Sequence, residues 1–130
     1  MNNDYLALDM DYDAEYDTLY LKSKKDYEYN VSIEANQNLV IDISKNGEVF
    51  AFEILDATYF FDLKNTELFH ANYEVNVIVT EDIIKLHFEV ITSGAVQNRA
   101  IKLVSSKALN TGQAVTGLYT YKYTQRRLNR

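Results

Sequence analysis

The chain has 130 residues, of which 13 are basic and 19 acidic, and it contains no cysteine and no proline. This length suits one domain that buries a core without cross-links. The lack of cysteine excludes disulfides and cysteine-based zinc sites. The N-terminal stretch is polar and acidic, and no apolar run approaches the roughly 20 residues of a membrane span. We therefore expect one cytoplasmic domain, residues 1–130, without a membrane partner.

Charge is distributed unevenly along the chain. Residues 95–130 carry seven Lys or Arg and no Asp or Glu, so all 19 acidic residues precede them. We expect the two parts to fold together and neutralise each other. The alternative is that a basic C-terminal segment, residues 119–130, binds an anionic partner through its basic side chains and its tyrosines. These residues are Lys122, Arg126, Arg127 and Arg130, with Tyr119, Tyr121 and Tyr123 to stack on bases. The net charge of −6 argues against nucleic acid as the main partner.

An acidic run lies near the start of the chain. Acidic residues occupy every second position from Asp9 to Asp17, an arrangement that either faces solvent or holds a divalent cation. An EF-hand is excluded, because its loop needs a glycine and a bidentate glutamate where this chain has Ala14 and Tyr20. A looser site of oxygen ligands for Ca²⁺ or Mg²⁺ stays open. Its candidate ligands are Asp11, Asp13, Glu15 and Asp17.

Alternation of apolar and polar residues predicts strands from residue 27 onward. Residues 27–34 alternate in this way, and residues 39–54 contain the Asn46-Gly47 dipeptide that is typical of a two-residue type I′ hairpin turn. Such a turn fixes the register and places three apolar pairs on one face. The predicted pairs are Leu39 with Ile54, Ile41 with Phe52, and Ile43 with Phe50.

The alternation breaks between the two strand-rich blocks. There Asn65 or Thr66 is expected to cap a short helix that carries Leu68 and Phe69 inward. A second short helix or a loop is expected to start near Ser105.

A second meander is predicted over residues 73–104, with reversals at Glu81-Asp82 and Ser93-Gly94. Folding at these points aligns the apolar residues of three successive strands on one face. The predicted pairs are Val75 with Phe88, Val77 with Leu86, Val79 with Ile84, Ile101 with Leu86, and Leu103 with Ile84.

The chain holds two histidines, His70 and His87. His87 lies on the polar face of its strand and is expected to be exposed, and His70 is expected to pack or cap. Either histidine, together with the acidic run, would supply the metal ligands of a hydrolase. The spacing of these histidines and carboxylates matches no known motif. No nucleophile or phosphate-loop motif is present, so we expect no cofactor and assign no catalytic residue.

Two stretches, "YDAEYDTLYL" and "LVIDISKNGEVFAFEILDAT", resemble the DUF2283 proteins, a prokaryotic group of unknown function. The resemblance covers residues 12–58. Matching positions of the first stretch are Tyr12, Asp13, Glu15, Asp17, Leu19 and Tyr20. Matching positions of the second are Ile41, Asp42, Gly47, Glu53, Ile54, Leu55 and Ala57. The resemblance implies a small β-rich domain and supplies no activity, cofactor or catalytic residue. It also implies a protein that pairs with a partner gene product, in the manner of an antitoxin.

The resemblance divides the acidic run into two strands joined by a turn. One strand is expected to end near Asp13 and the next to begin at Asp17. On this interpretation Asp13, Glu15 and Asp17 accept hydrogen bonds from N–H groups of the turn instead of holding an ion.

Together these features predict a mainly β domain of six to eight strands with one or two short helices. Its antiparallel meanders are expected to pack as a sandwich or a partly closed barrel, because a single sheet cannot bury its own apolar face. The alternative is that homodimerisation buries edges or faces of the sheets, because residues 27–34 and 119–123 look like strands that would otherwise lie exposed. The leading functional hypothesis is a non-enzymatic protein–protein interaction or oligomerisation module. The alternatives are a carboxylate-based divalent-metal protein or hydrolase and an antitoxin-like partner.

Overall fold

The computed structural model describes residues 5–104 and 115–125, and within these ranges it contains nine strands and two short helices. The elements in chain order are β1 (Leu6–Asp13), β2 (Thr18–Ser23), β3 (Tyr29–Asn36), β4 (Leu39–Ser44), β5 (Val49–Leu55), α1 (Ala57–Phe61), α2 (Asn65–His70), β6 (Asn72–Val79), β7 (Ile83–Ile91), β8 (Val96–Val104) and β9 (Gly117–Tyr123). The element expected near Ser105 and the arginines at 126, 127 and 130 lie outside the described residues. No helix in the described part is long and apolar enough to cross a membrane.

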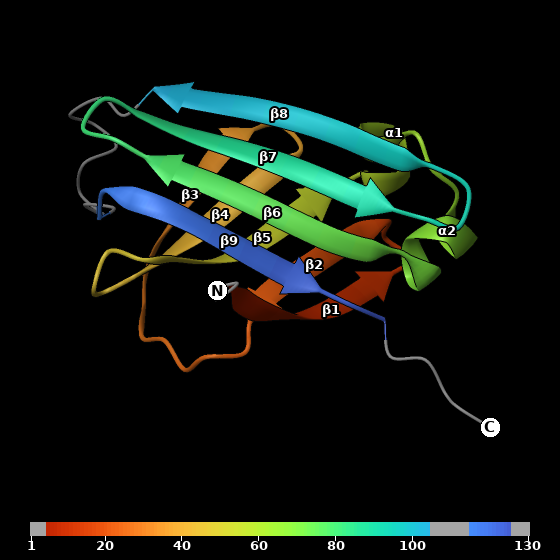
Figure 1. The fold of residues 1–130 in the computed structure, drawn as a ribbon, viewed down its shortest axis with the longest axis horizontal. Helices are drawn as coiled ribbons and strands as arrows, with labels where there is room; N and C mark the ends of the chain where they lie inside the picture. The colour runs from red at the N-terminus through yellow and green to blue at the C-terminus, as the bar shows by residue number, and fades with distance from the viewer. Residues whose placement is uncertain (1–4, 105–114, 126–130) are drawn as a thin grey trace, which may run out of the picture.

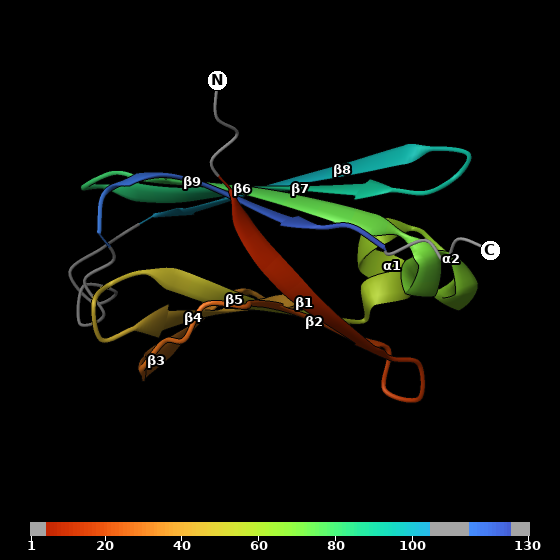
Figure 2. The same cartoon turned by 60° about the horizontal axis from the view of Figure 1, so that its bottom comes forward.

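The strands form one mixed sheet in the order β3-β4-β5-β2-β1-β9-β6-β7-β8 (Figure 1). The sheet curls into a half-barrel of two facing layers, with β1 running obliquely from one layer to the other (Figure 2). β1 pairs antiparallel with β2 and parallel with β9. The mainly β, partly closed barrel predicted from the sequence is therefore confirmed, with one strand more than the expected six to eight.

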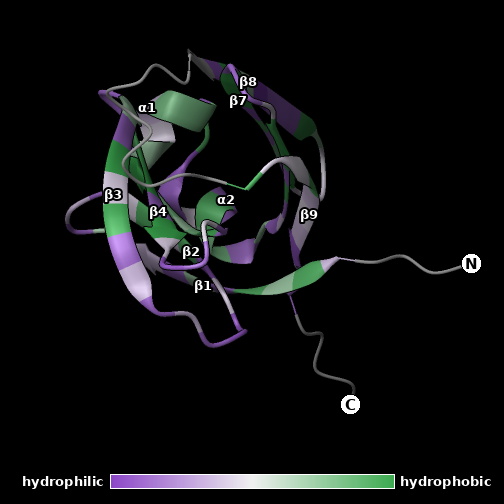
Figure 3. Cartoon of the chain, turned by 90° about the vertical axis from the view of Figure 1, so that its left-hand side faces the viewer, coloured by the Kyte–Doolittle hydropathy of each residue, from purple (hydrophilic) through white to green (hydrophobic). Residues whose placement is uncertain are grey.

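The space between the two layers holds the apolar core. Alternate residues of both layers are apolar and buried, and they belong to one hydrophobic core. Apolar (green) residues recur along the strands of both layers (Figure 3). The ring of Phe52 on β5 meets Phe88 on β7 edge-on at a centroid distance of 5.7 Å, and it meets Tyr121 on β9 at 5.1 Å. These contacts join the first half of the chain to the second.

The second meander has the register that the alternation predicts. All eight residues of β6 pair with β7 and all nine residues of β8 pair with β7, without a register shift. The confirmed pairs are Val75 with Phe88, Val77 with Leu86, Val79 with Ile84, Ile101 with Leu86, and Leu103 with Ile84.

The first meander departs from prediction at its turn. The pairs of Leu39 with Ile54 and Ile41 with Phe52 are confirmed, but Ile43 lies opposite Val49 instead of Phe50, because a bulge follows the turn. The type I′ prediction is wrong: Gly47 has a φ of 83°, whereas Asn46 is not among the residues with positive φ. The Gly47 N–H donates to the Ser44 carbonyl at 2.9 Å. This is the three-residue loop in which a glycine forms the bulge.

The two helices close one end of the half-barrel (Figures 1 and 2). α1 follows β5 directly and was not predicted. The residue that caps α2 is Lys64, not Asn65 or Thr66, and the Lys64 N–H donates to Oε1 of Glu67 at 2.8 Å. Leu68 is buried as predicted, but Phe69 is 41% exposed, so its inward placement was wrong.

The segment "YTYKY" lies at the centre of the sheet. It was expected to be an exposed strand, but β9 pairs with β1 on one side and with β6 on the other. Tyr121 is fully buried, and its hydroxyl donates to the carbonyl of Val49. The anionic-partner hypothesis required Tyr121 to stack on a base, and its burial prevents this. The other predicted edge is confirmed, because β3 is an end strand of the sheet.

Candidate functional site

The acidic run forms the β1–β2 hairpin. Asp13 Oδ1 accepts hydrogen bonds from the N–H groups of Glu15 at 3.0 Å and Tyr16 at 3.2 Å. The prediction that Asp13 bonds the turn is confirmed. Asp11 and Glu15 are exposed to solvent, and Asp11 and Asp13 line a groove with Tyr16 on the outer face of the sheet.

Asp17 has a different role from the one expected. Its carboxylate accepts hydrogen bonds from the Tyr12 hydroxyl at 2.6 Å, the Thr58 hydroxyl at 2.6 Å and the Thr58 N–H at 3.1 Å. Thr58 is the second residue of α1, so Asp17 caps this helix from the turn of the β1–β2 hairpin. Asp56, the N-cap residue of α1, makes no side-chain cap bond. Burial and the neighbouring Asp17 raise the pKa of Tyr12. Asp17 therefore connects the β1–β2 hairpin to α1 by hydrogen bonds.

The histidines lie apart from this hairpin. Nδ1 of His70 is 2.9 Å from the Thr66 carbonyl one turn earlier in α2. His87 was expected to be exposed but is half-buried on the outer face of β7. Among the described residues, no group of three or more His, Asp or Glu is arranged to hold a metal. A metal site that uses Asp11, Asp13, Glu15 and Asp17 stays a prediction.

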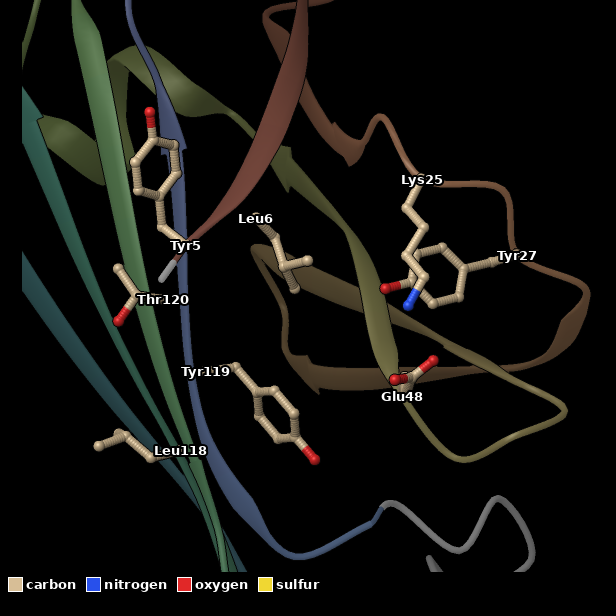
Figure 4. Close-up of a pocket in the computed structure, with 8 residues that line it drawn as sticks. All are labelled: Tyr5, Leu6, Lys25, Tyr27, Glu48, Leu118, Tyr119 and Thr120. Carbon is tan, nitrogen blue, oxygen red and sulfur yellow. The ribbon is translucent and has the colours of Figure 1, made fainter. Parts of the chain in front are cut away.

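A cleft opens where the two layers meet at β1 (Figure 4). Its volume is about 360 Å³, within the range of small-molecule sites. Its walls come from the start of β1, the β2–β3 connection, the residue before β5, and β9. The lining residues are Tyr5, Leu6, Lys25, Tyr27, Glu48, Leu118, Tyr119 and Thr120.

One wall of the cleft carries its charged groups. The Tyr27 ring stacks on buried Phe50 at a centroid distance of 5.2 Å, and Nζ of Lys25 lies 5.5 Å from the centre of the Tyr27 ring. Figure 4 shows the ends of Lys25 and Glu48 on the same side of the cleft as Tyr27. The wall therefore offers an ammonium donor and a carboxylate acceptor beside an aromatic ring.

The opposite wall is Tyr119 of β9 (Figure 4). Its hydroxyl donates to the Val115 carbonyl at 3.0 Å, and a Cβ added at Gly117 would lie 3.0 Å from the hydroxyl oxygen. Gly117 thus leaves room for the ring to lie back against the backbone. Burial, with Glu48 and Tyr27 nearby, raises the pKa of Tyr119. A fixed, neutral aromatic ring faces the charged wall.

Sequence reasoning did not find this cleft. Its residues come from four separate segments, and no single motif contains them. The sequence did indicate Tyr119 as a ring that stacks on bases, but it did not indicate which other side chains share the space beside that ring.

The two end strands of the sheet differ in their regularity. The pairing of β3 with β4 shifts register twice, between Tyr29 and Val31 and between Glu34 and Asn36. β8 pairs with β7 without a shift over nine residues, and its other side has no neighbouring strand in the described sheet. Bulges protect an edge from further pairing, whereas a long, regular edge is open to it.

Comparison with known proteins places the chain in a family. The family model described as "Protein of unknown function (DUF2283)" matches residues 9–57, from within β1 to the first residue of α1. A protein of Methanosarcina mazei named "Putative hypoxanthine phosphoribosyltransferase" is 31% identical over 88 residues, which are 66% of this chain and 69% of the relative. No solved structure matches the chain. The chain belongs to the DUF2283 family.

Proposed function

We propose that the protein is a self-association module in which β8 pairs with β8 of a second copy. The observation that carries this proposal is the regular nine-residue edge of β8, whose outer side has no neighbour in the described sheet. Figure 1 places β8 along the border of its layer. Two copies related by a twofold axis would join their sheets by main-chain hydrogen bonds.

The sequence of β8 suits antiparallel pairing with itself. A twofold axis perpendicular to the sheet keeps the inner faces of both copies on one side, so only residues of the same face lie opposite each other. Centring the axis on Ala100 makes all nine residues of the strand overlap. Centring it on Arg99 or Lys102 would place like charges opposite each other and shorten the overlap, which disfavours those registers.

The Ala100-centred register pairs Asn98 of each copy with Lys102 of the other. Both side chains are exposed, so a charge introduced at Asn98 acts across the new interface. Within one chain, Asn98 lies opposite Glu89 of β7. A lysine at position 98 would therefore be favourable inside the monomer and unfavourable in the dimer, and a glutamate would have the opposite effects.

This opposition gives a direct test by sedimentation equilibrium at tens of micromolar. We expect the wild type to dimerise, Asn98→Lys to weaken the dimer roughly tenfold, and Asn98→Glu to tighten it, since two cross-strand pairs change per dimer. The double variant N98K/K102E restores opposite charges and is expected to recover the dimer. Thermal melting of each variant separates these effects from changes in monomer stability.

Two outcomes would contradict the proposal. One is that the wild type and the Asn98→Glu variant, each measured alone, both stay monomeric at tens of micromolar. The other is a dimer that responds equally to Asn98→Lys and Asn98→Glu. A monomer that instead captures a strand from another protein would favour the antitoxin-like pairing implied by the family resemblance.

A second candidate function is the binding of a purine base. The name of the Methanosarcina mazei relative includes hypoxanthine, and the observation that favours this candidate here is the tyrosine-lined cleft. Aromatic rings bind flat bases by stacking, worth about 1–3 kcal/mol per base, and the volume of about 360 Å³ accommodates a base with part of its sugar. Saturation-transfer NMR with inosine is the test: transfer to the base protons is expected, and its absence at millimolar inosine would contradict this candidate.

A further inference from the structure

We infer that Lys25 and Glu48 read the hydrogen-bonding edge of the base and select a 6-oxopurine, such as hypoxanthine or guanine, over adenine. This inference deepens the second candidate function and rests on it. Its basis is the placement of one cationic donor and one anionic acceptor on the same wall of the cleft, opposite the Tyr119 ring (Figure 4).

The chemistry of the purine edge makes this pair selective. A 6-oxopurine presents an N1–H donor directly beside the O6 acceptor. A carboxylate accepts from N1–H while an ammonium group donates to O6, and hydrogen bonds to charged groups are the stronger kind. Adenine presents the reverse, an N1 acceptor beside an amino donor. In an adenine held in the same orientation as the 6-oxopurine, Lys25 and Glu48 would then each face a group of their own kind.

The position of Lys25 depends on the aromatic residues beneath it. Tyr27 is held against buried Phe50 with an interplanar angle of 21°, and the ammonium group of Lys25 lies over the Tyr27 ring. Attraction between a cation and an aromatic face holds the ammonium group near the cleft. Glu48 is fixed at its backbone, because its N–H donates to the Ser44 hydroxyl at 3.1 Å and its carbonyl accepts from the Ser44 N–H at 2.8 Å.

Tyr119 supplies the stacking surface. Its hydroxyl is bonded to the Val115 carbonyl, and the ring lies close to Gly117. Since the ring is already held in place, a base that stacks on it loses little side-chain freedom on binding. The cleft therefore combines a stacking surface on β9 with an edge-reading pair contributed by the other layer.

Isothermal titration of the full chain with inosine and with adenosine tests the inference. We expect the wild type to bind inosine at least about tenfold more tightly than adenosine. Lys25→Met and Glu48→Gln are each expected to reduce this preference to within about threefold. Glu48→Gln acts by offering an N–H to N1 of adenine. Lys24→Met is the matched control, because Lys24 is the preceding residue, pairs with Asp9 at 3.7 Å and does not line the cleft.

The outcomes separate the inference from the function on which it rests. Equal binding of inosine and adenosine by the wild type would overturn the edge-reading role and leave purine binding intact. A preference for inosine that survives both Lys25→Met and Glu48→Gln would also overturn it. Binding of neither nucleoside would overturn both. Circular dichroism of each variant excludes misfolding as the cause of a loss.

Discussion

The two meanders of this protein have the same strand order along the chain but opposite kinds of edge. In β3–β4–β5 the pairing shifts register three times, and its outer strand, β3, is bulged. In β6–β7–β8 the pairing is continuous, and its outer strand, β8, is regular. Bulges add local twist and interrupt an edge. Within the described residues, one end of the sheet is therefore interrupted by bulges, while the other presents a long, regular edge.

The largest effect is expected where the two meanders share a core. Phe88 on β7 is 1% exposed and contacts Phe52 on β5 edge-on. Phe88→Ala is expected to lower the free energy of unfolding by about 3–5 kcal/mol, because it removes a buried ring and leaves a cavity. Urea unfolding should show one transition shifted to lower denaturant. Two separate transitions would show that the meanders are independent units, and Phe69→Ala, at a 41% exposed ring, is the control.

A smaller loss of stability is expected where Asp17 connects the β1–β2 hairpin to α1 by hydrogen bonds. Asp17→Asn keeps a residue that tolerates the left-handed backbone (φ 53°) but removes the charge that the three donors share. We expect a loss of about 2–3 kcal/mol, since hydrogen bonds to charged groups are worth about 1.5–3 kcal/mol each. Asp13→Asn, in the same hairpin, should change stability by less than about 0.5 kcal/mol. Equal losses in both variants would contradict the capping role of Asp17.

The smallest effect compares the two meander turns. Gly47→Ala places a side chain at a φ of 83° and is expected to cost about 1–2 kcal/mol. Thr80→Ala removes the hydroxyl that accepts from the N–H groups of Asp82 and Ile83 and is expected to cost about 0.5–1 kcal/mol. Thermal melting measures both. A Gly47→Ala protein as stable as the wild type would mean that the first turn has room to change type.

The regular parts of the fold were predictable because their information is local. Strict alternation in β6, β7 and β8 allows one register that keeps the apolar residues on one face, and the structure has that register. The predicted type of the turn after β4 was wrong. The Ser44 hydroxyl accepts hydrogen bonds from the N–H groups of Asn46 and Glu48, and these bonds favour a different loop. The prediction of a type I′ turn from Asn46-Gly47 takes no account of the Ser44 side chain.

The missed features depend on distant residues. α1 has five residues, too few for a sequence pattern, and Asp17 caps it from 41 positions earlier. The central place of β9 depends on its pairing with β1, which no local pattern reveals. The candidate site was predictable in part: Asp13 lies where the hairpin interpretation placed it, whereas the cleft gathers residues from four segments and needed the structure.

The parallel pairing of β1 with β9 has a consequence for how the protein is made. Leu6 pairs with Tyr121 and Ala7 with Lys122, so β1, which leaves the ribosome before the other described strands, waits for β9, which follows all of them. Until β9 emerges, one edge of β1 and one edge of β6 stay unpaired, and the sheet does not join the two layers. Contacts this distant in sequence slow folding. A chain cut short before residue 117 would therefore keep most of its strands and still present an open, aggregation-prone intermediate.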